Sequence, residues 1–317
     1  MTSLYWLVRR ELWESRAVWV APLICALIIV GGALIASFGA GHVVINVDGH
    51  DVGFTMGGLV DSMNATLTPA RAESIVSLTL GAIAVPFFIT ILFTQFFYAL
   101  DALYGERRDR SILFWKSLPV SDAETVLAKL AVAGLLIPVA AMLAAFATQL
   151  LVCAIASARV ASAPLLAAEL WNPATWAGSL LVMSYVLVGG ILWYLPLLGW
   201  LLLVSASVPR SPFLWAFLPP LALALAEYVV FHSSILIGVI GERFGNGGLF
   251  AHAFTGVHGS GFTISIEDET LAVPHALTEL MRPAEFFGSA SLWGGVAVGV
   301  ALTAAAIWMR RYRDATA

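Results

Sequence analysis

Charged side chains are scarce in this sequence. Only 11% of its 317 residues are Asp, Glu, Lys or Arg, whereas 60% are hydrophobic. A soluble domain carries about 25% charged residues, so this chain has too few polar side chains to cover a surface in water. An integral membrane protein is therefore expected. The net charge of −4 and the lack of a basic domain argue against nucleic acid as a partner.

Cysteine and lysine are each present only twice. Cys25 and Cys153 lie inside apolar runs, which predicts small buried side chains and excludes a disulfide scaffold. A phosphate-binding P-loop needs a lysine directly after a glycine. Lys116 follows a tryptophan and Lys129 follows an alanine, so we expect no ATP site in this chain. We also expect no catalytic residues, and therefore no enzyme.

Long apolar runs dominate what is present. A membrane-spanning helix needs about 20 apolar residues; five such runs carry no charge and a sixth contains only Glu227. The runs are continuous rather than alternating, which favours an all-α bundle of six transmembrane helices over a membrane barrel. The predicted spans are residues 17–38, 75–100, 126–158, 174–206, 212–238 and 286–309.

The fourth run, residues 174–209, is too long for one straight crossing, because its helix would measure about 54 Å. Gly189, Gly190 and Pro196 could kink it or divide it into two spans. The distribution of Lys and Arg decides between these. Six spans place 12 of the 16 basic residues on the inner side and a seventh span places only 10 there, so six spans with both termini cytoplasmic are expected.

Three segments are predicted outside the spans. Residues 2–16 carry Leu4, Val8 and Leu12 on one face, which indicates a helix lying in the cytoplasmic membrane interface, although a solvated tail is the alternative. The outer loops, residues 39–74 and 239–285, are expected to form a small cap, with a hairpin turn at Asp48. The histidines in these loops have no spacing typical of metal ligands, so no metal is expected.

The cytoplasmic segment 101–125, called the coupling segment below, combines a charge cluster with an apolar cluster. Such a patch is typical of a protein docking surface, and anchoring in lipid headgroups is the alternative. A capping box at Ser121 and Glu124 is predicted to start the next helix. The candidate docking residues are Glu106, Arg107, Arg108, Asp109, Arg110, Leu113, Phe114 and Trp115.

Polar side chains are few inside the spans. Glu227 is predicted near the middle of the fifth span, where a buried acid lines a polar path or packs against a neighbouring helix. The other candidates for a translocation path are Thr90, Thr94, Gln95 and Tyr185.

Residues 103–130, LYGERRDRSILFWKSLPVSDAETVLAKL, and the basic end of the last span, TAAAIWMRRYRD, resemble ABC-2 type permeases. These proteins are the membrane subunits of ABC exporters. The resemblance implies a bacterial inner-membrane permease that lines the export path. It also implies a second permease subunit, expected to be identical, and two separate ATPase subunits that bind ATP and Mg.

The cargo is expected to be amphiphilic or hydrophobic, because the candidate path is mostly apolar. Two other functions stay open at this point. A secondary carrier would use Glu227, and an intramembrane enzyme would need a nucleophile or a metal set within the membrane.

Overall fold

The structure is a computed structural model that describes residues 2–38, 42–47, 50–55, 68–109, 120–244, 248–254, 257–258, 261–262 and 277–313. Six helices in these residues are long and apolar enough to cross a membrane. The expected fold class is therefore confirmed, and the chain is a multi-pass membrane protein.

The long helices are α2 (Ala17–Phe38), α4 (Pro69–Asp101), α8 (Ile137–Ser157), α10 (Pro173–Trp193), α12 (Pro212–Phe231) and α16 (Ala290–Arg313). The shorter helices are α1 (Thr2–Glu14), α5 (Tyr104–Arg108), α7 (Asp122–Ala131), α9 (Pro164–Leu170), α11 (Leu195–Ser207), α13 (Ile235–Phe244), α14 (Gly248–Ala253) and α15 (Pro283–Gly288). A π-helical turn, Val132–Leu136, joins α7 to α8, and 3₁₀ turns cover Val160–Ser162 and Leu277–Leu280. The strands are β1 (His42–Val47), β2 (His50–Thr55), β3 (Val257–His258) and β4 (Gly261–Phe262).

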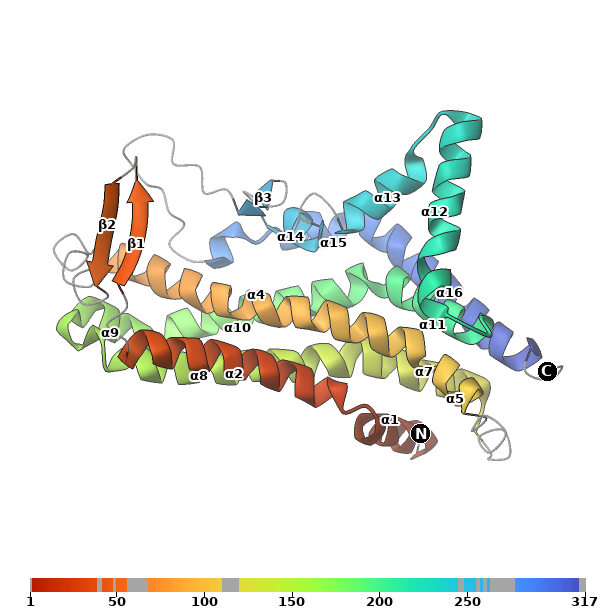
Figure 1. Cartoon of the computed structure of the whole chain (residues 1–317), viewed down its shortest axis with the longest axis horizontal. Coiled ribbons are helices and arrows are strands. Elements are labelled where there is room, and N and C mark those ends of the chain that lie inside the picture. Colours follow the sequence, from red (N-terminus) through yellow and green to blue (C-terminus); the bar gives the residue numbers. More distant parts are fainter. Residues whose placement is uncertain are drawn as a thin grey trace.

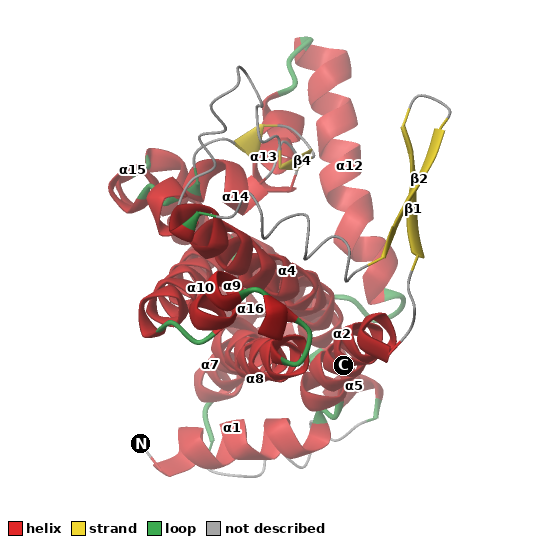
Figure 2. Ribbon diagram, turned by 90° about the vertical axis from the view of Figure 1, so that its left-hand side faces the viewer, coloured by secondary structure: helices red, strands yellow, loops and turns green. Residues whose placement is uncertain are grey.

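Both termini lie at the same end of the bundle. Figure 1 shows α1, α5 and the end of α16 at this end, with the β1–β2 hairpin and α9 at the other. An even number of spans returns the chain to the side where it began, so this arrangement agrees with six crossings. Figure 2 shows α1 lying across the bundle instead of along it, as a helix in a membrane interface would.

The fourth apolar run is divided at Tyr194, between α10 and α11. Pro196 lies in the first turn of α11. A backbone N–H in this turn has no partner inside the helix, so the lack of an N–H in proline costs no hydrogen bond. α11 has 13 residues, about 20 Å of helix, which is shorter than the roughly 30 Å hydrocarbon core. The run therefore supplies one long helix and one short helix, and not two spans.

The fifth predicted span ends early. α12 stops at Phe231, whereas the sequence predicted a helix to residue 238. His232 takes a left-handed backbone conformation with φ of 50° and ends the helix, and α13 begins at Ile235. Glu227 consequently lies close to the end of α12 and not at its middle. Figure 1 shows α12 leaving the direction of the other long helices.

The outer segments are described in part. β1 and β2 pair as an antiparallel hairpin in which His42 faces Thr55, as predicted, although the turn at residues 48–49 lies outside the described residues. Residues 262–269, FTISIEDE, also have a strand-like sequence, and all but Phe262 lie outside the described residues. The cap formed by the two outer loops remains a prediction.

The predicted topology can be tested with single cysteines in a background that lacks Cys25 and Cys153. We expect an impermeant thiol reagent to label Asn46→Cys in intact cells, but not Arg108→Cys or Ala317→Cys. In the structure Asn46 lies on β1 and Arg108 on α5, at opposite ends of the bundle. Labelling of Arg108→Cys before lysis would contradict the predicted orientation.

Candidate functional site

A cluster of buried charges lies at the end of the bundle that holds both termini. Its members come from four helices that are far apart in the sequence. They are Glu11 of α1, Glu106 of α5, Asp122 and Lys129 of α7, and Arg310 of α16. We call this group the buried charge cluster.

Glu106 is the centre of the cluster because each of its carboxylate oxygens binds a different cation. Lys129 Nζ lies 3.0 Å from Glu106 Oε1, and Arg310 Nη1 lies 2.8 Å from Glu106 Oε2. Lys129 also binds Glu11 Oε1 at 2.8 Å, and Arg310 Nε binds Asp122 Oδ1 at 3.1 Å. The four ion pairs join α1, α5, α7 and α16 into one unit.

The centre of the cluster is almost dry, whereas Asp122 at its edge is 27% exposed. The Lys129 and Arg310 side chains are only 4% and 3% exposed, and the Tyr98 hydroxyl of α4 donates a hydrogen bond to Glu11 Oε2 at 2.9 Å. Removing an ion from water costs several kcal/mol, which is offset only where partners and geometry are good. Each of these charges is therefore held in place by the others.

The local sequence explains how α7 positions Asp122 and Lys129, its two residues in the buried charge cluster. Ser121 Oγ accepts a hydrogen bond from the Glu124 N–H, and the Glu124 carboxylate accepts one from the Ser121 N–H at 2.9 Å. This capping box, predicted from the sequence, fixes the start of α7. Asp122 and Lys129 are seven residues apart, so they lie on the same helical face.

The described docking candidates divide into two kinds. Glu106 belongs to the buried charge cluster, and Arg107 donates to the backbone carbonyls of Ser205 and Val208 at the end of α11. Arg108 and Asp109 are exposed and pair with each other at 3.1 Å. The remaining candidates, Arg110, Leu113, Phe114 and Trp115, lie outside the described residues.

Besides the contacts with Arg107, α11 holds the first part of the coupling segment through the Ser205 side chain. The Ser205 hydroxyl accepts hydrogen bonds from the backbone N–H groups of Leu103 and Tyr104, each at 2.9 Å. The residues just before 110–119 are thus bound to α11 and α16. The residues just after them lie on α7, which is bound to α1 and α16. The described residues on both sides of this stretch are therefore bound to one long helix, α16, through Glu106 and Asp122.

Two of the candidate path residues line different cavities. Thr94 lines a groove beside the α1–α2 junction, whereas Gln95 lines a separate small cavity and donates to the Ala133 carbonyl at 2.8 Å. Thr90 donates to Pro86 O within its own helix at 2.9 Å, and the Tyr185 hydroxyl donates to Ala253 O at 3.0 Å. Their role in transport remains a prediction.

Glu227 binds the start of the next helix. Its carboxylate accepts hydrogen bonds from the Ser233 hydroxyl and from the backbone N–H groups of Ile235, at 2.8 Å, and Leu236, at 2.9 Å. The first N–H groups of any helix lack partners inside the helix. Glu227 therefore caps α13 and closes the turn between α12 and α13.

The capping contacts lead us to expect that Glu227→Gln lowers thermal stability, because an amide offers one acceptor oxygen in place of two. Transport activity should fall only with the folded fraction. Glu285→Gln is the control, because Glu285 is exposed and its ion pair with Arg282 lies on the surface. Loss of transport by Glu227→Gln at unchanged stability would contradict this and assign Glu227 to the path.

Comparison with protein-family models, with curated proteins and with solved structures gives no match. The resemblance of residues 103–130 to ABC-2 type permeases therefore rests on the sequence pattern alone. Within the described residues, no group of three or more His, Cys, Asp or Glu side chains is arranged to hold a metal ion.

Most members of the buried charge cluster were missed at the level of sequence. The sequence pattern indicates Glu106 as a docking residue and includes Lys129 in the permease-like segment, but it assigns no site role to Glu11, Asp122 or Arg310. The sequence offers one indication of a shared site, which is that all five residues lie near the ends of apolar runs. Charges at such positions ordinarily face water, which is why the pattern did not indicate buried partners.

Proposed function

We propose that the chain is the membrane-spanning permease subunit of an ATP-binding cassette exporter and is coupled to separate ATPase subunits. The observation that carries the proposal is the attachment of the residues on both sides of 110–119 to α16, through Glu106 and Asp122. This stretch contains Phe114 and Trp115, the strongest docking candidates in the permease-like sequence. The buried charge cluster supports a role in transmitting movement from a docked partner.

Coupling to an ATPase requires a stiff attachment of the docking stretch to the helices. An ATPase on a separate chain can move the permease only through a non-covalent contact, and a loop attached loosely to the helices would absorb the movement. Here Glu106 precedes the docking stretch and Asp122 and Lys129 follow it. All three are held in ion pairs, which are buried for Glu106 and Lys129 and partly exposed for Asp122. Displacing the stretch therefore displaces α1, α7 and α16, or breaks charges that are costly to separate.

A secondary carrier is less well supported. Carriers of this kind place coupling groups near the bilayer midplane between repeated halves. The one acidic side chain on α12, Glu227, is close to the helix end and is bound by three local donors. Nothing in the described residues favours an intramembrane enzyme either.

The proposal predicts that Phe114→Ala combined with Trp115→Ala releases the ATPase. Truncating a buried aromatic anchor typically costs about 2 kcal/mol or more, which is roughly a thirtyfold loss of affinity. The measurement is the stoichiometry of the ATPase that co-purifies with the tagged permease when both are expressed together. The double variant should remain folded and membrane-inserted.

A matched control removes two exposed aromatic side chains elsewhere, Phe231→Ala with Trp293→Ala. This control should retain its ATPase. Full ATPase stoichiometry in the Phe114→Ala, Trp115→Ala variant would contradict docking through these side chains. Loss of membrane insertion without loss of the ATPase would instead support headgroup anchoring.

A further inference from the structure

The helix that runs from the coupling segment into the bundle is interrupted by a π-helical turn. α7 ends at Ala131, the turn covers Val132–Leu136, and α8 begins at Ile137. The Ile137 N–H bonds the Val132 carbonyl, five residues back instead of four. Such turns are rare and are frequently found at functional sites. The junction between α7 and α8 is therefore a candidate for a further role.

Pro138 accounts for the π-helical turn. Proline has no N–H, and its ring clashes with the carbonyl group four residues earlier, which here is that of Gly134. The same proline affects the Ala133 carbonyl. The α-helical donor to this carbonyl, the Ile137 N–H, bonds Val132 instead, and the π-helical donor would be the N–H that Pro138 lacks. The Ala133 carbonyl consequently has no partner within the described helix.

A side chain from α4 supplies the missing donor. Gln95 Nε2 donates to the Ala133 carbonyl at 2.8 Å, and Gln95 is only 4% exposed. Gln95 and Pro138 also line the same small cavity. An unpaired carbonyl would be costly here, because Ala133 is fully buried. The hydrogen bond from Gln95 therefore holds the π-helical turn against α4.

The turn sets the rotation of α7 relative to α8. Each residue of an α-helix changes the side-chain direction by about 100°, so one surplus residue rotates the whole of α7 by about that angle. Lys129 lies four residues before Ala133, one helical turn from the carbonyl that Gln95 binds. At the observed rotation, Lys129 reaches Glu11 and Glu106, at 2.8 and 3.0 Å. A regular α-helical turn would direct its amine away from both.

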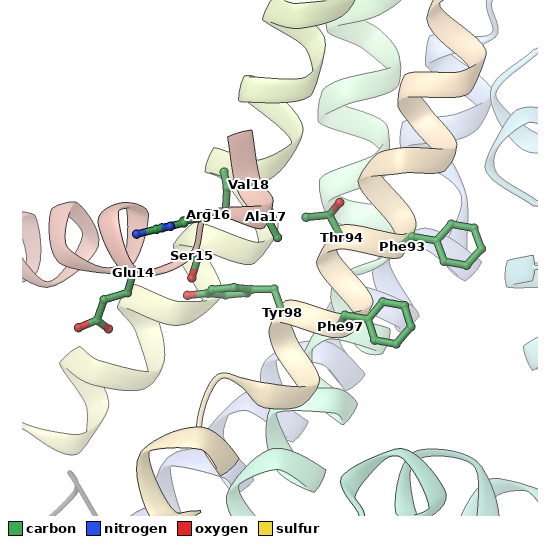
Figure 3. Close-up of a pocket in the computed structure, with 9 residues that line it drawn as sticks. All are labelled: Glu14, Ser15, Arg16, Ala17, Val18, Phe93, Thr94, Phe97 and Tyr98. Atoms are coloured by element: carbon green, nitrogen blue, oxygen red, sulfur yellow. The ribbon is translucent and has the colours of Figure 1, made fainter. Parts of the chain in front are cut away.

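α4 also holds a partner of Lys129. Tyr98 lies about one helical turn after Gln95 on α4, and its hydroxyl donates to Glu11 Oε2 at 2.9 Å. Figure 3 shows the Tyr98 side chain reaching from α4 toward Ser15, in the turn between α1 and α2. One face of α4 thus fixes both α1 and the junction that orients α7.

We propose that Gln95 is a positioning residue for the buried charge cluster. Its amide replaces the donor that Pro138 lacks and fixes the π-helical turn. It thereby sets the rotation at which α7 directs Lys129 toward the cluster. The placement of Lys129 does not depend on the proposed transport function, whereas any effect of Gln95 on transport rests on it.

Gln95→Met tests the hydrogen bond, because methionine keeps the length of the side chain but donates nothing. We expect the unfolding equilibrium constant in mixed micelles to rise about tenfold or more, the effect of leaving a buried carbonyl unpaired. The next step adds Pro138→Ala, which restores an N–H that can bond the Ala133 carbonyl. It should recover most of the loss in the Gln95→Met background.

Two controls separate the restored N–H from changes in packing. Pro138→Val also restores the N–H but keeps more of the side-chain volume, so it should rescue Gln95→Met as well. Gln149 is the matched amide, because it is fully buried and donates to the Leu80 carbonyl at 2.9 Å. It lies about three helical turns further along α8. Gln149→Met should also destabilise the protein, but Pro138→Ala should not rescue it.

The link to the cluster is tested by combining Gln95→Met with Lys129→Met. Together these should cost less than the sum of the single variants, whereas Gln149→Met and Lys129→Met should be additive. All these measurements are of unfolding, so their outcome is independent of ATPase docking.

Two results would overturn the positioning role. One is additivity of Gln95→Met and Lys129→Met, and the other is failure of both Pro138 variants to rescue Gln95→Met. Should Gln95→Met not fold on its own, recovery of folded protein by Pro138→Ala would support the proposal, and no recovery would overturn it.

Discussion

Lys129→Met is expected to destabilise the protein by about 3–5 kcal/mol, the cost of breaking a buried ion pair by removing one partner. Lys129 is the only cation bound to Glu11 among the described contacts, and it shares Glu106 with Arg310. Without it, two buried carboxylates remain and only one of them keeps a cation. The free energy of unfolding, measured for the purified chain in mixed micelles, should show this loss.

The matched control breaks an ion pair at the surface. Arg10 and Glu14 form an i,i+4 pair on α1, and Arg10→Met should cost about 0.5 kcal/mol or less. A second test combines Lys129→Met with Glu106→Gln, which should cost less than the sum of the single variants because the two groups share one network. Additive effects, or equal costs for Lys129→Met and Arg10→Met, would contradict a desolvated cluster.

The same residues bear on the proposed function. If the buried charge cluster transmits movement, Glu106→Gln should leave ATPase binding intact, because Phe114 and Trp115 are unchanged. Transport should fall more than the folded fraction does. A purely structural role predicts unchanged activity per folded molecule, whereas a coupling role predicts lower activity per folded molecule.

The helices of the fold were predictable from the sequence because they depend on local composition. Runs of about 20 apolar residues can lie only in a membrane, and all six predicted spans have a long helix in the structure. The start of α7 was equally local, because a capping box needs only Ser121 and Glu124. Each of these features is decided by residues that are close together in the sequence.

The end of α12 and the buried charge cluster depend on contacts that composition does not reveal. Hydropathy continues past Phe231, so the left-handed turn at His232 and the cap from Glu227 gave no signal. The cluster joins residues that are 118 and 204 positions apart, Glu11 with Lys129 and Glu106 with Arg310. Such pairings follow from how the helices pack, which one sequence does not specify.

α11 and α16 pack closely, because two glycines let their backbones approach. A Cβ atom on Gly299 would lie 2.8 Å from the backbone carbon of Leu195 and 2.8 Å from the backbone nitrogen of Pro196. A Cβ atom on Gly199 would lie 2.7 Å from the Gly299 carbonyl oxygen. Small residues at such positions are typical of tightly packed membrane helices.

Gly299→Val should therefore destabilise the protein by about 3 kcal/mol or more, the upper end for an overpacked core, because backbone atoms cannot move aside as a side chain can. Unfolding in mixed micelles measures the change. Gly294→Val is the matched control on the same helix, because a Cβ atom at Gly294 meets nothing within 4 Å. Separation of α11 from α16 would also move Arg310 relative to Glu106, so transport per folded molecule should fall as well, whereas ATPase co-purification should persist because Phe114 and Trp115 are unchanged. A Gly299→Val variant as stable as Gly294→Val would show that α11 and α16 do not pack this closely.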